Sequence, residues 1–111
     1  MKTTREFAPA DRYRYDFGPC SYERGFAQID TAQDASYFGT WCSPGRLIIV
    51  SYCEGDVTTQ ECESAEEFAT ELRRIDEWNV AHGHGHARID PGLDLAFRQK
   101  FEAMGLTDLL H

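Results

Sequence analysis

The segment from residue 37 to residue 62 constrains the fold most, because it contains strand-like runs separated by two turn signals. The runs are rich in β-branched and aromatic residues and comprise residues 37–42 (YFGTWC), 46–54 (RLIIVSYCE) and 57–62 (VTTQEC). Pro44 and Gly45 suit a type II turn after the first run. Gly55 and Asp56 suit a two-residue hairpin after the second. The segment therefore predicts a three-stranded antiparallel meander.

The two turns also predict a pairing register. Tight turns place Cys42 opposite Leu47 and Cys53 opposite Thr58, so no two cysteines face each other and no disulfide is expected within the meander. Side chains alternate between the two faces of a strand. One face is expected to hold Cys42, Leu47, Ile49, Cys53 and Cys62. The other is expected to hold Tyr37, Trp41, Ile48, Val50, Tyr52 and Val57. Both faces are apolar, so we expect a helix on one and another layer or a partner on the other.

Two amphipathic helices are expected after the meander. Residues 64–82 repeat apolar side chains every three or four positions, and Ser64 with Glu67 forms a capping box. The apolar positions are Phe68, Leu72, Ile75 and Trp78. A second helix is expected to begin at Asp90, which acts as its cap, and to end at Gly105. A short turn at residues 107–111 should close the domain.

Before the meander, residues 12–17 (RYRYDF) and 25–30 (GFAQID) also alternate as strands do. We therefore predict one α+β domain spanning residues 1–111, an antiparallel β-meander sheet of four to five strands packed with two α-helices. Residues 1–11 form a candidate flexible basic N-terminal arm. Basic residues interleaved with tyrosines also occur in segments that bind single-stranded nucleic acid, and an edge strand with solvated arginines is the alternative.

The chain is acidic, with a formal net charge of −8 and a pI near 4.8. Binding to a nucleic-acid backbone needs a surplus of Lys and Arg, so a basic protein surface is the expected partner. Between Arg46 and Arg73 the sequence has acids but no Lys or Arg. These acids are Glu54, Asp56, Glu61, Glu63, Glu66, Glu67 and Glu71. They are expected to form one acidic docking surface, and a solvated turn beside a charged helix start is the alternative.

The stretch HGHGH sets His82, His84 and His86 two residues apart. His82 falls where a helix should end, and Gly83 suits the left-handed residue that follows such an end. An extended HGHGH segment would instead turn all three imidazoles to one side, where they could bind Zn²⁺ with Asp90 in a metal-dependent sensor or enzyme. We take a helix stop as the primary role and a metal site as the alternative.

The sequence contains no catalytic motif, so we expect neither an enzyme nor a cofactor. A nucleophilic thiol paired with a histidine is the chemical alternative, and Cys20 is its candidate because it lies outside the meander. Tyr37, Trp41 and Tyr52 form an alternative homo-oligomer interface, with a homodimer as the simplest form. No apolar run approaches the roughly 20 residues that span a bilayer, so no membrane association and a cytoplasmic location are expected.

The segment YFGTWCSPGRLIIVSYCEGDVTTQECESAEEFATELRRIDEWN, followed by IDPGL, resembles a group of small proteins of proteobacterial mobile elements. In its small size, its acidity and its resemblance to proteins of mobile elements, the chain is similar to anti-CRISPR proteins. The resemblance implies an inhibitor that blocks a basic nucleic-acid-binding surface of a host defence complex, with a CRISPR effector subunit as its partner. It assigns no role to any single residue. The expected function is therefore that of a non-enzymatic acidic binding protein.

Overall fold

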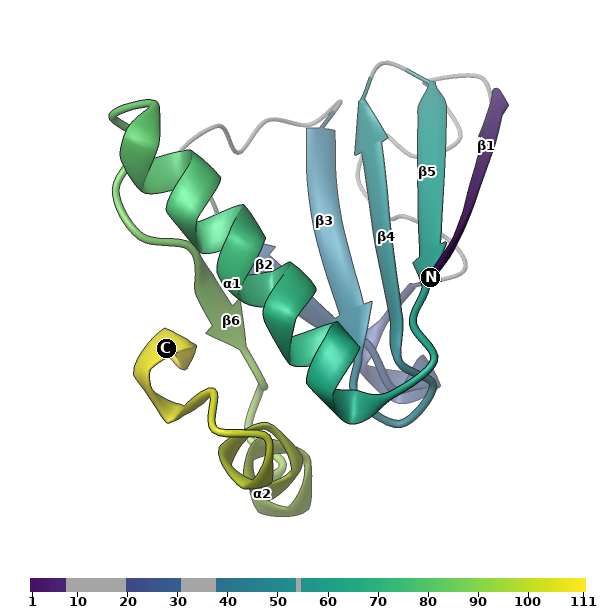
Figure 1. Ribbon diagram of the computed structural model, residues 1–111. Helices are drawn as coiled ribbons and strands as arrows, with labels where there is room; N and C mark the ends of the chain where they lie inside the picture. Colours follow the sequence, from purple (N-terminus) through teal and green to yellow (C-terminus); the bar gives the residue numbers. More distant parts are fainter. Residues whose placement is uncertain (8–19, 31–37, 54) are drawn as a thin grey trace.

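A computed structural model describes residues 1–7, 20–30, 38–53 and 55–111. Within these residues, six antiparallel strands form one sheet in the order β1-β5-β4-β3-β2-β6, accompanied by two α-helices (Figure 1). The strands are β1 (Lys2–Phe7), β2 (Ala27–Asp30), β3 (Phe38–Ser43), β4 (Ile48–Cys53), β5 (Asp56–Glu61) and β6 (Arg88–Asp90). The helices are α1 (Ala65–Ala81) and α2 (Leu95–Ala103), with 3₁₀ turns η2 (Tyr22–Arg24) and η3 (Thr107–Leu109). The predicted α+β class with an antiparallel meander is confirmed.

The sheet extends beyond the predicted meander at both ends. Strand β1 pairs with β5 over its whole length, from Lys2 opposite Glu61 to Phe7 opposite Asp56. Residues 2–7, which were expected within a flexible arm, are therefore an edge strand of the sheet. Residues 8–11 and the strand expected at 12–17 lie outside the described residues. At the other edge, β6 pairs with β2, and its Ile89 is bridged by Leu110 near the end of the chain.

The pairing register at both turns differs from the predicted one by two residues. The β3–β4 turn spans residues 44–47, and its positive φ of 60° falls on Leu47 and not on Gly45. The Leu47 amide closes this turn by donating to the carbonyl oxygen of Ser43 at 2.8 Å. Cys42 therefore lies opposite Ile49, and Cys53 lies opposite Asp56. A shift of two residues leaves every side chain on its predicted face, because the strand period is two.

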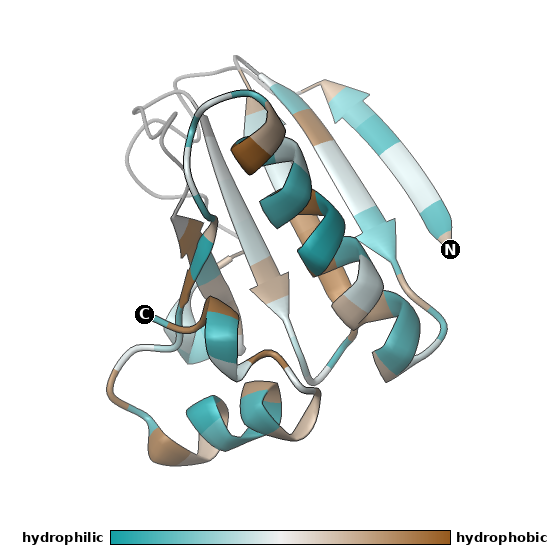
Figure 2. Ribbon diagram, turned by 60° about the vertical axis from the view of Figure 1, so that its left-hand side comes forward, coloured by the Kyte–Doolittle hydropathy of each residue, from teal (hydrophilic) through white to brown (hydrophobic). Residues whose placement is uncertain are grey.

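The face that contains Cys42 and Ile49 is the one that α1 covers (Figure 1). Phe68 and Leu72 of α1 are 0% and 2% exposed against this face, while the hydrophilic side of the helix is turned away from the sheet (Figure 2). The same core extends to the end of the chain through Ile89, Phe101, Leu106, Leu109 and Leu110. This continuity joins α1, β6, α2 and η3 into one apolar core.

The opposite face of the sheet has a smaller core. Val50 and Val57 are buried there with Cys20 and Phe26, and Trp41, Ile48 and Tyr52 pack against them. Residues 20–26 of the same chain therefore cover part of the face for which the sequence left open a layer or a partner.

The predicted helix boundaries are partly correct. Ser64 caps α1 by accepting a hydrogen bond from the Glu67 amide at 3.1 Å, as expected. Trp78, expected in the core, is 50% exposed. The predicted start of the second helix at Asp90 is wrong, because α2 is capped by Asp94, which accepts from the amides of Ala96 and Phe97. Asp90 ends β6 and accepts from the Gly92 amide instead.

Among the described residues, no helix is both long enough and apolar enough to cross a membrane.

Candidate functional site

The HGHGH segment ends α1 by a Schellman motif. The His84 amide donates to the carbonyl oxygen of Asn79 at 2.8 Å, and the Gly83 amide donates to that of Val80 at 3.1 Å. Gly83 adopts the left-handed φ of 76° that this motif requires. The predicted helix stop is confirmed.

The three imidazoles do not gather at one point, because His82 and His84 lie at Trp78 and His86 lies at Asp76. The ring of His82 stacks on Trp78 with 4.0 Å between centroids, and His84 lies near the same ring at 5.9 Å. His86 turns to the other side of α1, where its Nδ1 lies 3.0 Å from Oδ1 of Asp76. Accordingly, the described residues contain no group of three His, Cys, Asp or Glu side chains arranged to hold a metal ion. The geometry does not favour the alternative of a metal site built from the three histidines.

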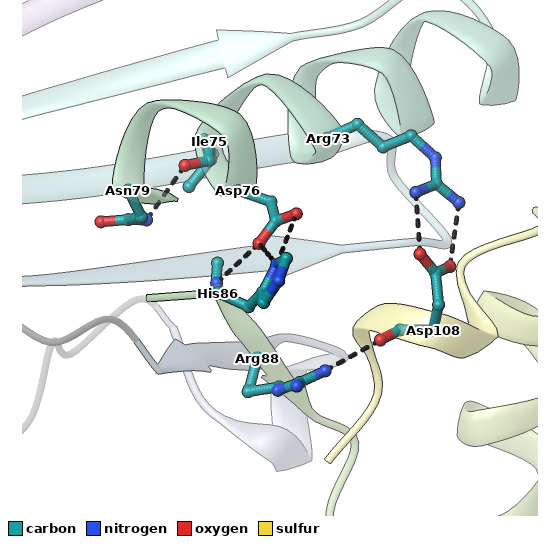
Figure 3. A network of polar contacts seen from close by, with 8 residues as sticks. Arg73, Ile75, Asp76, Asn79, His86, Arg88 and Asp108 are labelled. Atoms are coloured by element: carbon teal, nitrogen blue, oxygen red, sulfur yellow. Dashed lines mark hydrogen bonds and ion pairs between the residues drawn. The ribbon is translucent and has the colours of Figure 1, made fainter. Parts of the chain in front are cut away.

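Asp76 anchors the chain that follows the helix (Figure 3). Its Oδ1 accepts from the backbone amide of Ala87 at 2.8 Å, while both carboxylate oxygens contact His86. Ala87 is buried at 3% exposure, so its amide depends on this carboxylate for a hydrogen-bond partner. The contact fixes Ala87, the residue just before β6, against α1.

A second set of hydrogen bonds connects α1 to the C-terminal end of the chain. The guanidinium of Arg73 donates to both carboxylate oxygens of Asp108 at 3.0 Å and to the carbonyl oxygen of Gly105 at 2.6 Å. Arg88 of β6 donates to the carbonyl oxygen of Asp108 (Figure 3). The hydrogen bonds between the Arg73 and Asp108 side chains hold the pKa of Asp108 below its usual range. They also raise the pKa of Arg73 above its usual value. These contacts bring together β6, η3 and the middle of α1.

Asp76→Ala is expected to lower the free energy of unfolding by about 1–2 kcal/mol, because it leaves the buried Ala87 amide without an acceptor. Urea denaturation monitored by circular dichroism measures the change. Asp76→Asn is the matched control, since it keeps an oxygen in the same place and should cost less. Equal stability of Asp76→Ala and the wild type would show that the contact contributes nothing.

The seven acids expected to form one surface are separated by the fold. Glu54 lies outside the described residues. Asp56 begins β5 and Glu61 ends it, five residues and about 17 Å apart. Glu63, Glu66, Glu67 and Glu71 follow at the start of α1 and within its first two turns. The acidic surface of the described residues is therefore smaller than predicted and lies where β5 leads into α1.

Several of these acids are already paired. Glu61 lies 3.9 Å from the ammonium of Lys2, and Glu67 lies 3.2 Å from the amino group of Met1. Glu71 is only 8% exposed and lies 3.4 Å from Arg74. By contrast, Glu63 and Glu66 are exposed and have no ion pair with any residue that the structure describes. These two carboxylates are the most accessible negative charges of the candidate surface.

The aromatic face does not offer the flat surface that the oligomer alternative needs. Trp41 and Tyr52 are half-buried against the core of Cys20, Phe26, Val50 and Val57. The edge of Tyr22 packs on the Trp41 ring at 5.8 Å, so residues of this chain occupy part of the face. Tyr37, the third residue of the predicted interface, lies outside the described residues.

All four cysteines are free, and they differ in burial from the prediction in two places. Cys20, the candidate nucleophile, is 1% exposed, and burial raises its pKa to about 12. A thiol in this state is a poor nucleophile at neutral pH. Cys53 shares the predicted face but is exposed at the end of β4, while Cys42 is buried as predicted and Cys62 is half-buried. The structure therefore gives no support to catalysis by Cys20.

A groove that the sequence did not reveal lies between η2, the β3–β4 turn and the segment leading into α2. Its volume is about 610 Å³, and its walls include Tyr22, Phe97 and the side chains of Arg24, Arg46 and Lys100. These residues come from three segments far apart in the chain, and none belongs to a recognisable motif. Only the tertiary packing of the segments could have shown that they meet.

Two surfaces of the described residues thus remain as candidate binding sites: the exposed acids at the start of α1 and the groove beside α2. No protein-family model, curated protein or solved structure matches the chain. Function is accordingly inferred from the charge and exposure of these surfaces.

Proposed function

We propose that the protein is a non-enzymatic binding protein that docks on a basic protein surface through the acids at the start of α1. The observation that supports this most is the exposure of Glu63 and Glu66 without a cationic partner among the described residues. Glu61 beside them has only a long, exposed ion pair with Lys2, whereas the half-buried Glu67 is held by the amino group of Met1. A basic partner would compete effectively with the pair between Glu61 and Lys2.

The position of these acids also favours docking. They lie at the N-terminal end of α1, where the helix dipole stabilises negative charge and α1 is held rigidly against the sheet by Phe68 and Leu72. Carboxylates on a rigid element lose little conformational freedom when they bind. The net charge of −8 would speed encounter with a basic partner and disfavours direct binding to nucleic acid.

The first partner class to test is the nucleic-acid-binding subunit of a CRISPR effector. This choice rests on the resemblance of the meander and α1 to small proteins of mobile elements. In this mechanism the acids would occupy a basic channel in place of nucleic-acid phosphates, as an anti-CRISPR inhibitor does by mimicry.

The experiment measures binding of the wild type and of two charge-reversed variants to purified, guide-loaded effector complexes by biolayer interferometry. The variant Glu63→Lys/Glu66→Lys should bind at least about tenfold more weakly than the wild type, and wild-type affinity should fall as salt is raised. The control Glu6→Lys/Glu77→Lys makes the same change in net charge at exposed acids elsewhere. Its binding should stay within about threefold of the wild type.

Three results would contradict the proposal. Equal loss in both variants would assign the effect to net charge, and unchanged affinity in the first variant would remove the α1 acids from the mechanism. Absence of binding to every effector complex would reject the CRISPR partner.

A further inference from the structure

The groove beside α2 is not used by the proposed docking through α1. Tyr22 and Arg24 of η2 form one wall, Arg46 of the β3–β4 turn forms the second, and Phe97 and Lys100 of α2 form the third. The groove therefore lies between three segments that are far apart in the chain but adjacent in the fold. Its volume of about 610 Å³ is in the usual range for ligand sites.

The cations of the groove are unlike most others in the described residues. Lys2, Arg73, Arg74 and Arg98 each have a carboxylate partner. Arg24, Arg46 and Lys100 make no ion pair with any residue within 1–7, 20–30, 38–53 or 55–111. Three cations without an ion pair among the described residues thus gather in one groove of a chain whose net charge is −8, and one of them, Arg46, lies over the Phe26 ring at 5.4 Å.

The two acids in the groove make no ion pair with these cations among the described residues, and three cations against two acids leave a formal charge of +1. Asp94 is engaged as the cap of α2, where its Oδ1 accepts from two backbone amides at 2.9 and 3.2 Å. Glu23 is an exposed residue of η2 and has no ion pair with a described cation. Charge complementarity therefore favours an anionic occupant.

The groove also has an apolar part. The Tyr22 ring is held in place by a hydrogen bond between its side chain and Asp90, and it packs so closely on Gly92 that an added Cβ there would lie 3.4 Å from the ring. Burial and this hydrogen bond raise the pKa of Tyr22 to about 12, so the phenol stays neutral. Leu93, which lines the groove, is 106% exposed, and Leu95 at the start of α2 is 66% exposed.

We propose that this groove binds an acidic peptide segment of a protein partner, with a large apolar side chain of the peptide placed between Tyr22 and Leu93. Carboxylates of the peptide would pair with Arg24, Arg46 and Lys100. The two guanidinium groups can each bind a carboxylate through two hydrogen bonds, and the lysine ammonium attracts it as a point charge. A peptide fits better than a small molecule because the exposed leucines extend the apolar surface beyond the groove. It fits better than nucleic acid because a short peptide places its carboxylates within the groove, whereas a long phosphate backbone would also cross the acidic surface of the rest of the chain.

The test uses the full chain and the peptide acetyl-EDFEDL-amide, with binding followed by two-dimensional NMR and by calorimetry. We expect saturable shifts of amides in residues 22–25, 43–46 and 91–100 at peptide concentrations below about 1 mM, weakening as salt is raised. The peptide acetyl-EDAEDA-amide should bind at least about fivefold more weakly, because it lacks the apolar side chains. The basic peptide acetyl-KKFKKL-amide should cause no shift in the groove.

Matched variants separate charge from apolar contact. Lys100→Glu should weaken binding of the acidic peptide about tenfold. Arg5→Glu makes the same charge change at an exposed position of β1, outside the groove, and should leave binding within about twofold. Leu93→Ser should weaken binding about fivefold, whereas Val80→Ser, at a 46% exposed position of α1, should not. All four positions are exposed or nearly so, and thermal denaturation verifies that each variant is folded.

The proposal is overturned by the absence of groove shifts at about 1 mM peptide, by equal effects of Lys100→Glu and Arg5→Glu, or by tighter groove binding of oligothymidylate than of the peptide. These outcomes are independent of the α1 site. Shifts confined to residues 63–71, or loss of peptide binding in Glu63→Lys/Glu66→Lys alone, would also count against the groove.

Discussion

Replacing Phe68 with Ala is expected to lower the free energy of unfolding by about 3–5 kcal/mol. Phe68 is 0% exposed and contributes to the core shared by α1 and the sheet, together with Cys42, Ile49 and Leu72. The substitution removes most of a buried aromatic side chain and leaves a cavity that a six-stranded sheet can fill only partly by relaxing. A loss of this size approaches the total stability of many small domains.

Urea denaturation followed by circular dichroism measures the effect, and Phe7→Ala is the matched control. Phe7 is 76% exposed at the end of β1, so the same chemical change there should cost less than about 1 kcal/mol. Equal costs at the two positions would contradict the burial of Phe68 beneath α1. Because α1 also presents Glu63 and Glu66, Phe68→Ala should weaken docking through these acids only to the extent that it unfolds the chain.

The strand faces could be predicted from the sequence even though the register was wrong. Both pairing registers were predicted two residues from the observed ones, and in the β3–β4 pair the reason is that Pro44 and Gly45 suggested a tight type II turn. The chain instead uses a longer turn in which Leu47 has the positive φ. The Leu47 amide donates a hydrogen bond to the carbonyl oxygen of Ser43. The alternation of side chains survives a shift of two, so Cys42 and Ile49 remained correctly assigned to one face.

The parts that sequence analysis missed depend on contacts between distant segments. Strand β6 has only three residues and is defined by pairing with β2 and by the bridge from Ile89 to Leu110. The sequence around Asp90 is equally compatible with a helix cap, and the tertiary pairing decides against it, so that Asp94 becomes the cap. The predicted acidic surface was too large for a related reason. Asp56 and Glu61 are close in the sequence, but they lie at opposite ends of the extended strand β5.

Gly39→Ala is expected to lower the free energy of unfolding by about 2–3 kcal/mol. Gly39 lies directly opposite Tyr52 in the β3–β4 pair, and the tyrosine ring lies over it. A Cβ at residue 39 would lie 2.7 Å from the Tyr52 hydroxyl oxygen and 2.8 Å from two ring carbons. Real Cβ atoms do not approach other atoms so closely, so the ring would have to leave its place against the second core. Chemical denaturation of the two proteins measures the difference.

A double-mutant cycle identifies the cause of this cost. In a Tyr52→Val background the ring is absent, so Gly39→Ala should cost at least about 1 kcal/mol less than in the wild type. If Gly39→Ala costs the same in both backgrounds, the tyrosine ring is not what requires glycine at this position. A smaller cost in the Tyr52→Val background would explain why glycine, which disfavours strands, lies near the start of β3. It makes room for the cross-strand aromatic ring that helps to close the second face of the sheet.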